Sequence, residues 1–297
     1  MPAAESIRAW TLVLVHWNQA EACVRTVGQF QDQAMPVAVI VVDNGSRPEE
    51  LEVLHHGLDG RDHVEIIECG TNLGFGPGAN VGLRRWLADG GTEWCLLAPH
   101  DAVPAPGCLA ALAEALSGEP LAGLACADVG DGQTPMVDPY FGGVTRAASR
   151  ADAGWEPADY PHGTLMVLRR GCIEEIGLFD ERFFSYCEEA DLGVRAREAG
   201  WAVGLVRGAR VRNTHIGSSV AAVDYLQERN TLRLVRSTSG RYHTFIRLCI
   251  SAWQLVNGVL RPSRRPLIFD ARARLLGVRD FLHGVSGPPP PHLYERR

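Results

Sequence analysis

Three carboxylates lie within four positions in the stretch FFSYCEEADLGVR, directly after an aromatic run. Carboxylates in such a cluster can accept or donate protons in a reaction. Ser185 and Glu188 have the spacing of a capping box, so Glu188 has both a structural and a functional interpretation. Asp191 and Arg195 are four apart, as in a helical ion pair. By elimination, Glu189 is the first candidate for chemistry.

A glycine-rich segment, TNLGFGPGANVGL, places four glycines in the nine residues 74–82, where a helix is expected to begin. Glycines allow a close approach of the backbone to a ligand, and a helix N-terminus favours anions. The segment lacks the GK[ST] of a Walker A loop, and it follows the third expected strand, unlike a dinucleotide-binding fingerprint. A phosphate site and a plain tight loop therefore both remain open.

Two further acids and one histidine lie near the ends of expected strands. Asp43 in VVDNGS could accept hydrogen bonds from a base or a ribose, or form an Asx-turn. Asp101 in LLAPHDAVPAPG is a hard oxygen ligand that could hold Mg²⁺ or Mn²⁺ against a diphosphate, or a turn residue. His215 in RNTHIGSS could complete the shell of such a metal, or form a structural hydrogen bond.

The elements that would position these residues alternate along the first half of the chain. Short apolar runs predict strands, and periodic segments predict helices; the strands are expected at 11–17, 37–43, 63–69, 93–99 and 121–127, and the helices at 21–33, 47–57, 78–90 and 106–117. This order predicts an α/β fold with a mainly parallel central sheet flanked by helices. Ligands of such sheets bind at the carboxyl ends of the strands, where the polar clusters lie.

The second half of the chain is less regular. Residues 129–161 are rich in Gly, Asp and Pro and predict a long loop or a small subdomain, and 201–215 predicts two short strands. Residues 242–260 form a candidate helix with an apolar face, interrupted by Arg247. The Pro-rich segment 284–297 is expected to be disordered.

The composition excludes several classes of protein. The chain has 297 residues, 46% of them hydrophobic, and a net charge of -6, which argues against nucleic-acid binding. The eight cysteines include no C-x-x-C pair, so a structural zinc site is not expected. Their scattered positions are typical of a protein of the reducing cytoplasm. We find neither a signal-peptide pattern nor a run of about 18 apolar residues.

Taken in order, the motifs resemble those of the inverting family 2 glycosyltransferases, particularly the rhamnosyltransferase-like branch. They are VHWN, VVDNGS, NLGFGPGANVGL, PHD, HGTLMVLRRG, IGLFDERFFSYCEEADLGVRAREAGW, HIGSS and ERNTLRLVR, and they span about residues 10 to 236. The resemblance implies a GT-A fold over 1–236, with a nucleotide-sugar half at about 1–128 and an acceptor half at about 129–236. A C-terminal helical extension, 237–283, and the Pro-rich tail would follow.

The resemblance also implies roles for individual residues. Glu189 falls on the second position of the family's Glu-Asp pair, which is the general base, and Asp101 and His215 fall on the positions of the metal ligands for Mg²⁺ or Mn²⁺. The donor-side candidates are His16, Asn18, Asp43, Asn44, Ser46, Asn72, Phe75, Asn80 and His100, and the acceptor-side candidates are His162, Gly163, Phe184 and Tyr186.

Two positions depart from the family pattern. The pair is Glu-Glu instead of Glu-Asp, so that Glu188 or Asp191 could replace Glu189 as the base. The family's D-x-D region reads Pro99-His100-Asp101, which leaves one acid for the metal.

The implied reaction moves a sugar from a dTDP- or UDP-sugar to a hydroxyl of a glycan, a lipid-linked intermediate or a secondary metabolite. One alternative is a non-catalytic sugar-nucleotide-binding pseudoenzyme. Another is a sugar-phosphate nucleotidyltransferase, but VHWNQAEA lacks the glycine and cation that follow the first strand in that class. For 242–260 we favour a packing helix or a dimer contact over a membrane contact, and expect a cytoplasmic protein with at most peripheral membrane binding and possible homodimerisation.

Overall fold

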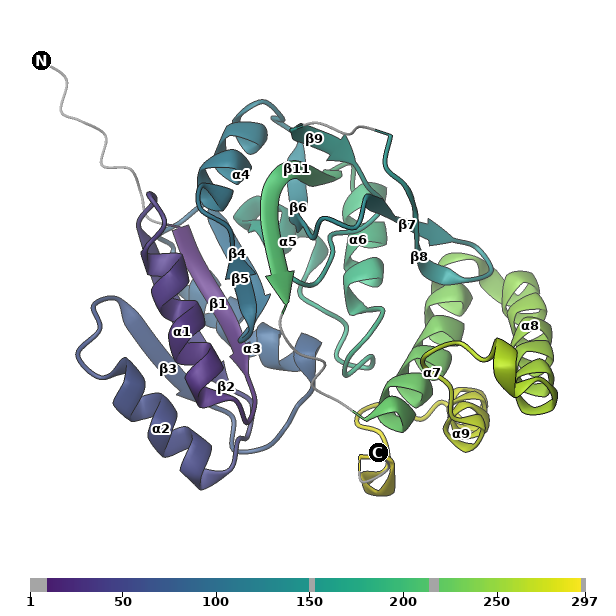
Figure 1. The fold of residues 1–297 in the computed structure, drawn as a ribbon. Helices are drawn as coiled ribbons and strands as arrows, with labels where there is room; N and C mark the ends of the chain where they lie inside the picture. The colour runs from purple at the N-terminus through teal and green to yellow at the C-terminus, as the bar shows by residue number, and fades with distance from the viewer. Residues whose placement is uncertain (1–9, 150–152, 214–218, 295–297) are drawn as a thin grey trace, which may run out of the picture.

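The computed structural model describes residues 10–149, 153–213 and 219–294, which build one central sheet with helices on both faces (Figure 1). Six strands of this sheet point the same way; in sheet order they are β3 (Val64–Glu68), β2 (Val37–Asp43), β1 (Trp10–His16), β4 (Trp94–Pro99), β6 (Ala122–Asp128) and β11 (Ala202–Asn213). The remaining strands run against them; β10 (Met166–Arg169) lies between β4 and β6, while β5 (Ala102–Pro104) and β9 (Gly154–Pro157) pair with β11.

The central strands are apolar on both sides because helices cover both faces of the sheet. Leu12 and Leu14 of β1 pack with one group of helices, α1 (Ala20–Gln31), α2 (Pro48–Leu58) and α4 (Cys108–Ser117). Val13 and Val15 face the other group, α3 (Phe75–Asp89), α5 (Arg170–Ile176) and α6 (Glu188–Glu198). The α/β fold with a mainly parallel sheet is therefore confirmed.

Three helices follow β11 and pack beside the sheet rather than on it (Figure 1). They are α7 (Val220–Thr238), α8 (Gly240–Leu260) and α9 (Ala271–Leu282), and the 3₁₀ turn η1 (Pro262–Arg264) lies between α8 and α9. α7 packs against both α8 and α9, and in Figure 1 α8 lies at the outer side of the molecule. None of the described helices is long and apolar enough to cross a membrane.

The structure differs from the sequence-based expectation in the second half of the chain. Residues 129–161 contain a β hairpin, β7 (Gln133–Asp138) and β8 (Gly142–Ala147), besides β9. The two strands expected in 201–215 are one long strand, β11, whose pairing with β6 shifts in register between Val206 and Arg210. Gly208, with a positive φ of 86°, accommodates this irregularity.

The expected disorder of 284–297 is wrong for the part that the structure describes. Residues 291–293 form a 3₁₀ turn, η2, and Leu293 is buried against Ala221, Ala222 and Tyr225 of α7. The carbonyl of Leu293 also accepts a hydrogen bond from Ser219. Besides the buried Leu293, Arg229 donates to the carbonyl of Gly287 at 2.8 Å and Arg233 to that of Val285 at 2.8 Å, which ties this segment to α7.

Candidate active site

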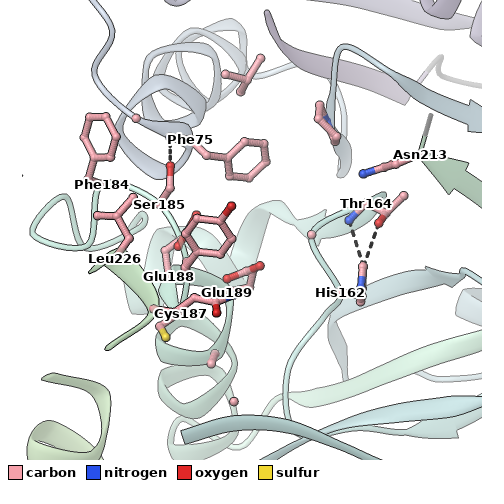
Figure 2. A pocket seen from close by; sticks show the side chains of 18 of the residues that line it. Phe75, His162, Thr164, Phe184, Ser185, Cys187, Glu188, Glu189, Asn213 and Leu226 are labelled. Carbon is pink, nitrogen blue, oxygen red and sulfur yellow. Dashed lines mark hydrogen bonds between the residues drawn. The ribbon is translucent and has the colours of Figure 1, made fainter. Parts of the chain in front are cut away.

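A cavity of about 720 Å³ lies where the carboxyl ends of β1 and β4 meet the start of α6. The structure brings most of the predicted site residues to its wall: Asn44, Asn72, Phe75, His100, Asp101, His162, Gly163, Phe184, Tyr186 and Glu189. Figure 2 shows the Glu188 and Glu189 side chains on one side of this cavity and His162 and Asn213 on the other. Residues far apart in sequence therefore form one site.

Five predicted donor-side residues do not line the cavity: His16, Asn18, Asp43, Ser46 and Asn80. His16 and Asp43 are buried and joined by a hydrogen bond of 2.9 Å, and the backbone N–H of Ser46 donates to Asp43 at 3.2 Å. Burial opposes ionisation of Asp43, but the hydrogen bonds from His16 and Ser46 outweigh it and hold its pKa below the usual value. This pair supports the cavity wall from behind. His215 lies outside the described residues.

Asparagine side chains fix the glycine-rich loop. The Asn44 amide donates to the Gly74 carbonyl at 2.9 Å, and its oxygen accepts from the backbone N–H of Leu73 at 3.0 Å. The Asn72 oxygen accepts from the backbone N–H of Gly74 at 2.9 Å. Asn80 instead holds a more distant segment, exchanging two hydrogen bonds with the backbone of Phe179 at 2.9 and 3.0 Å. These side-chain hydrogen bonds hold the backbone of the loop in one shape.

The turn that leads into α6 has an unusual backbone. Phe184, Tyr186 and Cys187 have positive φ angles of 67°, 70° and 73°, which are unfavourable for residues other than glycine. The Asn230 amide nitrogen lies within 3.0 Å of three carbonyls of this turn, those of Phe183, Ser185 and Tyr186. Asn230 therefore compensates a strained conformation at the entrance of α6, as is common at functional sites.

The capping box predicted from Ser185 and Glu188 is wrong. α6 begins at Glu188 itself, and Cys187 precedes it without a capping side chain. The Ser185 hydroxyl instead accepts a hydrogen bond of 3.0 Å from the backbone N–H of Phe75, seen as a dashed line in Figure 2. The tertiary contact with the glycine-rich loop has taken the place of the local cap.

Glu188 is thereby left without the structural role expected for it. Its side chain is 2% exposed, and Oε2 has no hydrogen-bond partner within the described part of the chain. Asp191 forms the expected ion pair with Arg195 at 2.9 Å, and it does not line the cavity. Glu188 and Glu189 are therefore the two acids of α6 that face the site.

The environment raises the pKa of the two glutamates to different extents. Burial raises the pKa of Glu188 well above its ordinary value, and repulsion by Glu189 raises it further. Burial also raises the pKa of Glu189. Two adjacent carboxylates cannot both ionise easily, so the pair holds one proton over a wide pH range. The shifts favour a protonated Glu188 beside an ionised Glu189.

This arrangement predicts that Glu188→Gln stabilises the protein in a pH-dependent way. The folded chain keeps a proton on Glu188 that the unfolded chain releases above about pH 4.3, so the unfolding free energy falls as the pH rises. Glutamine keeps the shape and cannot ionise. We expect a gain of about 1–3 kcal/mol at pH 8 and almost none at pH 4, measured by urea unfolding.

Glu198→Gln is the matched control, because Glu198 is exposed on the same helix. It should change stability little at either pH. An equal gain for Glu188→Gln at pH 4 and pH 8 would contradict the assignment of the proton.

On the opposite side of the cavity, His162 is held in one tautomer. Its Nδ1 accepts from the backbone N–H of Thr164 at 3.2 Å and lies 2.9 Å from the Thr164 hydroxyl, which leaves the ring proton on Nε2. Burial lowers the pKa of His162, so the ring is neutral near pH 7. A Cβ on Gly163 would lie 2.9 Å from Glu189 Oε1, so glycine at this position leaves room for the Glu189 carboxylate.

The cavity also offers a carboxylate to a metal. Asp101 is buried at the end of β4 and lines the cavity, next to His100, whose Nδ1 lies 3.2 Å from the Val15 carbonyl. The described residues contain no group of three or more His, Cys, Asp or Glu side chains arranged around a common metal position. Mg²⁺ and Mn²⁺ can, however, be held by one carboxylate together with phosphate oxygens. Asp101 fits such a shared site.

No residue of the C-terminal helices was predicted to line the site, yet these helices form one wall of the cavity. Asp224 and Glu228 of α7, Arg247 of α8 and Arg274 of α9 all line it. Arg274 pairs with Asp224 at 2.7 Å, and Arg247 with Glu228 at 3.3 Å. The available signals were the motif ERNTLRLVR, which contains Glu228, and the arginine that interrupts the apolar segment 242–260.

The sequence of the chain is similar to those of known glycosyltransferases. Residues 11–177 match the model of the family described as glycosyl transferase family 2. The N-acetylglucosaminyl-diphospho-decaprenol L-rhamnosyltransferase of Mycobacterium tuberculosis (strain H37Rv) is 28% identical over 205 residues, which cover 59% of this chain and 66% of that protein. The match thus spans just under two thirds of that relative. A Haloferax volcanii protein, the low-salt glycan biosynthesis hexosyltransferase Agl10, is 24% identical over 268 residues, 83% of this chain and 82% of that one.

Solved structures share the fold at low sequence identity. A mannosyltransferase, PcManGT from Pyrobaculum calidifontis, in complex with GDP-Man and Mn²⁺, has a TM-score of 0.59 at 12% identity, covering 93% of this chain and 87% of that one. GalNAc-T7 with UDP, GalNAc and Mn²⁺ has a TM-score of 0.65 at 14% identity, covering 94% of this chain and 56% of that one.

Proposed function

The chain belongs to glycosyl transferase family 2, and from this premise we propose that it is an inverting glycosyltransferase acting on a nucleotide diphosphate sugar. The GT-A fold expected from the sequence is confirmed by the solved structures that share it. The observation that carries the proposal is the Glu188–Glu189 pair, which shares one cavity with Asp101 and the glycine-rich loop. The proposal therefore sets an acid able to accept a proton beside the proposed site for a diphosphate.

In the proposed reaction Glu189 is the general base. An acceptor hydroxyl attacks the anomeric carbon of the donor sugar, its proton passes to Glu189, and the bond from that carbon to the diphosphate breaks. The electron pair of the broken bond leaves with the nucleoside diphosphate. The protonated Glu188 leaves the negative charge of the pair on Glu189, and burial raises the basicity of Glu189.

The donor is proposed to lie along Asn72, Phe75, His100 and Asp101, with the buried His16–Asp43 pair fixing the end of β1 behind it. A Mg²⁺ or Mn²⁺ ion, when bound, neutralises charge that develops on the leaving diphosphate. Asp101 would hold it, and His215 is the candidate second ligand. A dTDP- or UDP-sugar is the proposed donor class.

The acceptor is proposed to lie among His162, Gly163, Phe184 and Tyr186, which line the cavity. His162 Nε2–H is a neutral hydrogen-bond donor, and Phe184 and Tyr186 can stack on a sugar ring. The relative from M. tuberculosis acts, by its name, on a diphospho-decaprenol carrying N-acetylglucosamine. We propose the same class, a lipid-linked acceptor, with a glycan or a secondary metabolite as the alternatives. The eight free cysteines support a reducing, cytoplasmic location.

Calorimetric titration with dTDP, UDP, GDP and ADP, each with and without Mn²⁺, tests the donor site. We expect one pyrimidine diphosphate to bind, at least about tenfold more tightly with Mn²⁺. Asp101→Asn should remove that increment because the ion loses its carboxylate ligand. Asp59→Asn, at an exposed helix end, is the matched control and should behave as the parent.

Each failure has a distinct meaning in this experiment. Absence of binding to all four diphosphates would overturn the proposed donor site. Binding that is equal with and without Mn²⁺ would remove Asp101 as a metal ligand. Binding of a nucleotide sugar without any turnover would favour the non-catalytic pseudoenzyme.

A further inference from the structure

The outer face of α8 is apolar and exposed. Six large apolar side chains there are between 50% and 73% exposed: Tyr242, Phe245, Trp253, Val256, Val259 and Leu260. They recur at intervals that place them along one side of the helix, and Cys249 is exposed in the middle of the same stripe. Within the described residues nothing covers this stripe, which we call the α8 face.

The inner side of the same helix carries its polar groups. Thr244, Arg247 and Ser251 are buried there, and both Arg247 and Ser251 bond to Glu228 of α7. A surface helix in water normally has the opposite arrangement, with its apolar side toward the protein. The inverted polarity of α8 indicates that its outer face is built for an apolar environment.

The charge around the α8 face has one sign. Residues 239–269 contain no Asp or Glu, although the chain as a whole has a net charge of -6. Arg247 is compensated by Glu228 inside, whereas Arg241, Arg261, Arg264 and Arg265 are exposed. Leu267, two residues after the last of these arginines, is fully exposed. Apolar and cationic groups are therefore combined on one surface.

We propose that the α8 face, with the arginines that follow it, docks on an anionic lipid surface. Apolar side chains enter the headgroup region, tyrosine and tryptophan favour that depth, and arginines attract acidic lipids. A second copy of the chain is a poorer partner, because two such faces would bring arginines together without an acid between them. The proposal stands independently of the proposed sugar transfer.

The position of α8 adds a geometric consequence. Arg247 lines the cavity from the inner side of this helix, while the α8 face lies on its outer side. A helix with its side chains is about 10–12 Å across. Docking would therefore hold the cavity within roughly one helix diameter of the lipid headgroups, which suits an acceptor anchored in lipid.

Cosedimentation of the full chain with vesicles tests the proposal. We expect binding to vesicles of 30% phosphatidylglycerol in phosphatidylcholine, weakening steeply with salt, and much weaker binding to pure phosphatidylcholine. The triple variant Arg261→Gln, Arg264→Gln, Arg265→Gln should lower partitioning about 100-fold, at roughly fivefold for each arginine. Phe245→Ser with Trp253→Ser should lower it at least about tenfold, since two apolar anchors are lost.

Two matched control variants change exposed residues on other surfaces of the protein. Leu121→Ser removes a side chain 65% exposed, as Trp253 is, and Arg25→Gln removes an exposed arginine from α1. Both should bind vesicles as the parent does. Unchanged circular dichroism and unchanged nucleotide affinity would show that the α8 variants fold.

A site-specific measurement uses Cys249, the exposed one of the eight cysteines. A nitroxide label there should become inaccessible to aqueous quenchers when anionic vesicles are added. Failure of the parent to bind these vesicles would overturn the proposal, as would equal losses in the controls. A dimer in light scattering that Phe245→Ser with Trp253→Ser converts to a monomer, without vesicle binding, would assign the face to a second copy instead.

Discussion

Replacing Glu189 by glutamine is expected to lower sugar transfer by about 10²–10⁴-fold and to leave nucleotide affinity within about threefold. The amide keeps the size and the hydrogen-bonding shape of the side chain but cannot take the acceptor proton. Because Glu189 lies at the start of α6 and Asp101 lies just beyond the end of β4, the proposed donor site should remain intact. The effect should therefore appear in kcat, with little change in donor binding.

The assay would follow release of the nucleoside diphosphate from the donor identified by titration. A short-chain N-acetylglucosaminyl-diphospho-polyprenol would serve as acceptor. Glu198→Gln, exposed on the same helix, is the control and should retain full activity. Parental turnover by Glu189→Gln would remove Glu189 as the base; if Glu188→Gln were then inactive, Glu188 would take that role.

Gly74→Ala is expected to destabilise the fold by about 3 kcal/mol or more and to weaken diphosphate binding at least about tenfold. Gly74 has a φ of 94°, in a region open essentially to glycine alone. A Cβ there would lie 2.2 Å from the carbonyl oxygen of Phe184, which cannot retreat easily because Asn230 and Ser185 hold the same turn. The alanine would push the glycine-rich loop and the entrance of α6 apart.

Gly70→Ala separates the cost of the positive φ from the cost of the contact with Phe184. Gly70 also has a positive φ, 71°, but a Cβ there would meet nothing within 4 Å. It should cost only about 1–2 kcal/mol, the penalty of the backbone conformation. Urea unfolding and calorimetry on both variants measure the difference, and equal losses would show that contact with Phe184 does not matter.

The first half of the fold could be predicted from sequence because its signals are local. The run Val37–Asp43, for example, is a strand with the predicted bounds, since an apolar run ending in an acid already specifies a buried strand and its exit. The cavity wall was partly predictable for the same reason, because Asn72, Asp101 and Glu189 follow strand ends or begin a helix. Parallel strands then bring their carboxyl ends to one edge.

The rest of the fold and of the site depends on contacts between residues that lie far apart in the sequence. The capping box failed because Ser185 has the right spacing for a cap, yet its hydroxyl is engaged by Phe75, 110 positions earlier. The motif ERNTLRLVR marked Asn230 but not the turn that Asn230 holds. Arg274 was invisible, because a lone arginine in a helix pattern gives no sign of what it will face. The outward apolar side of α8 required knowledge of which side α7 covers.

The links between the glycine-rich loop and the turn before α6 also bear on how the chain folds. Phe75 with Ser185 and Asn80 with Phe179 close loops of about a hundred residues, and Asn230 adds a later contact to the same turn. Contacts of such long sequence separation form late, because chain entropy must be lost before they gain anything. The parallel strands near the N-terminus can assemble early, so the acids of α6 should reach their final positions only in the last folding step. A ligand of the cavity would then stabilise the product of that step and slow its reversal.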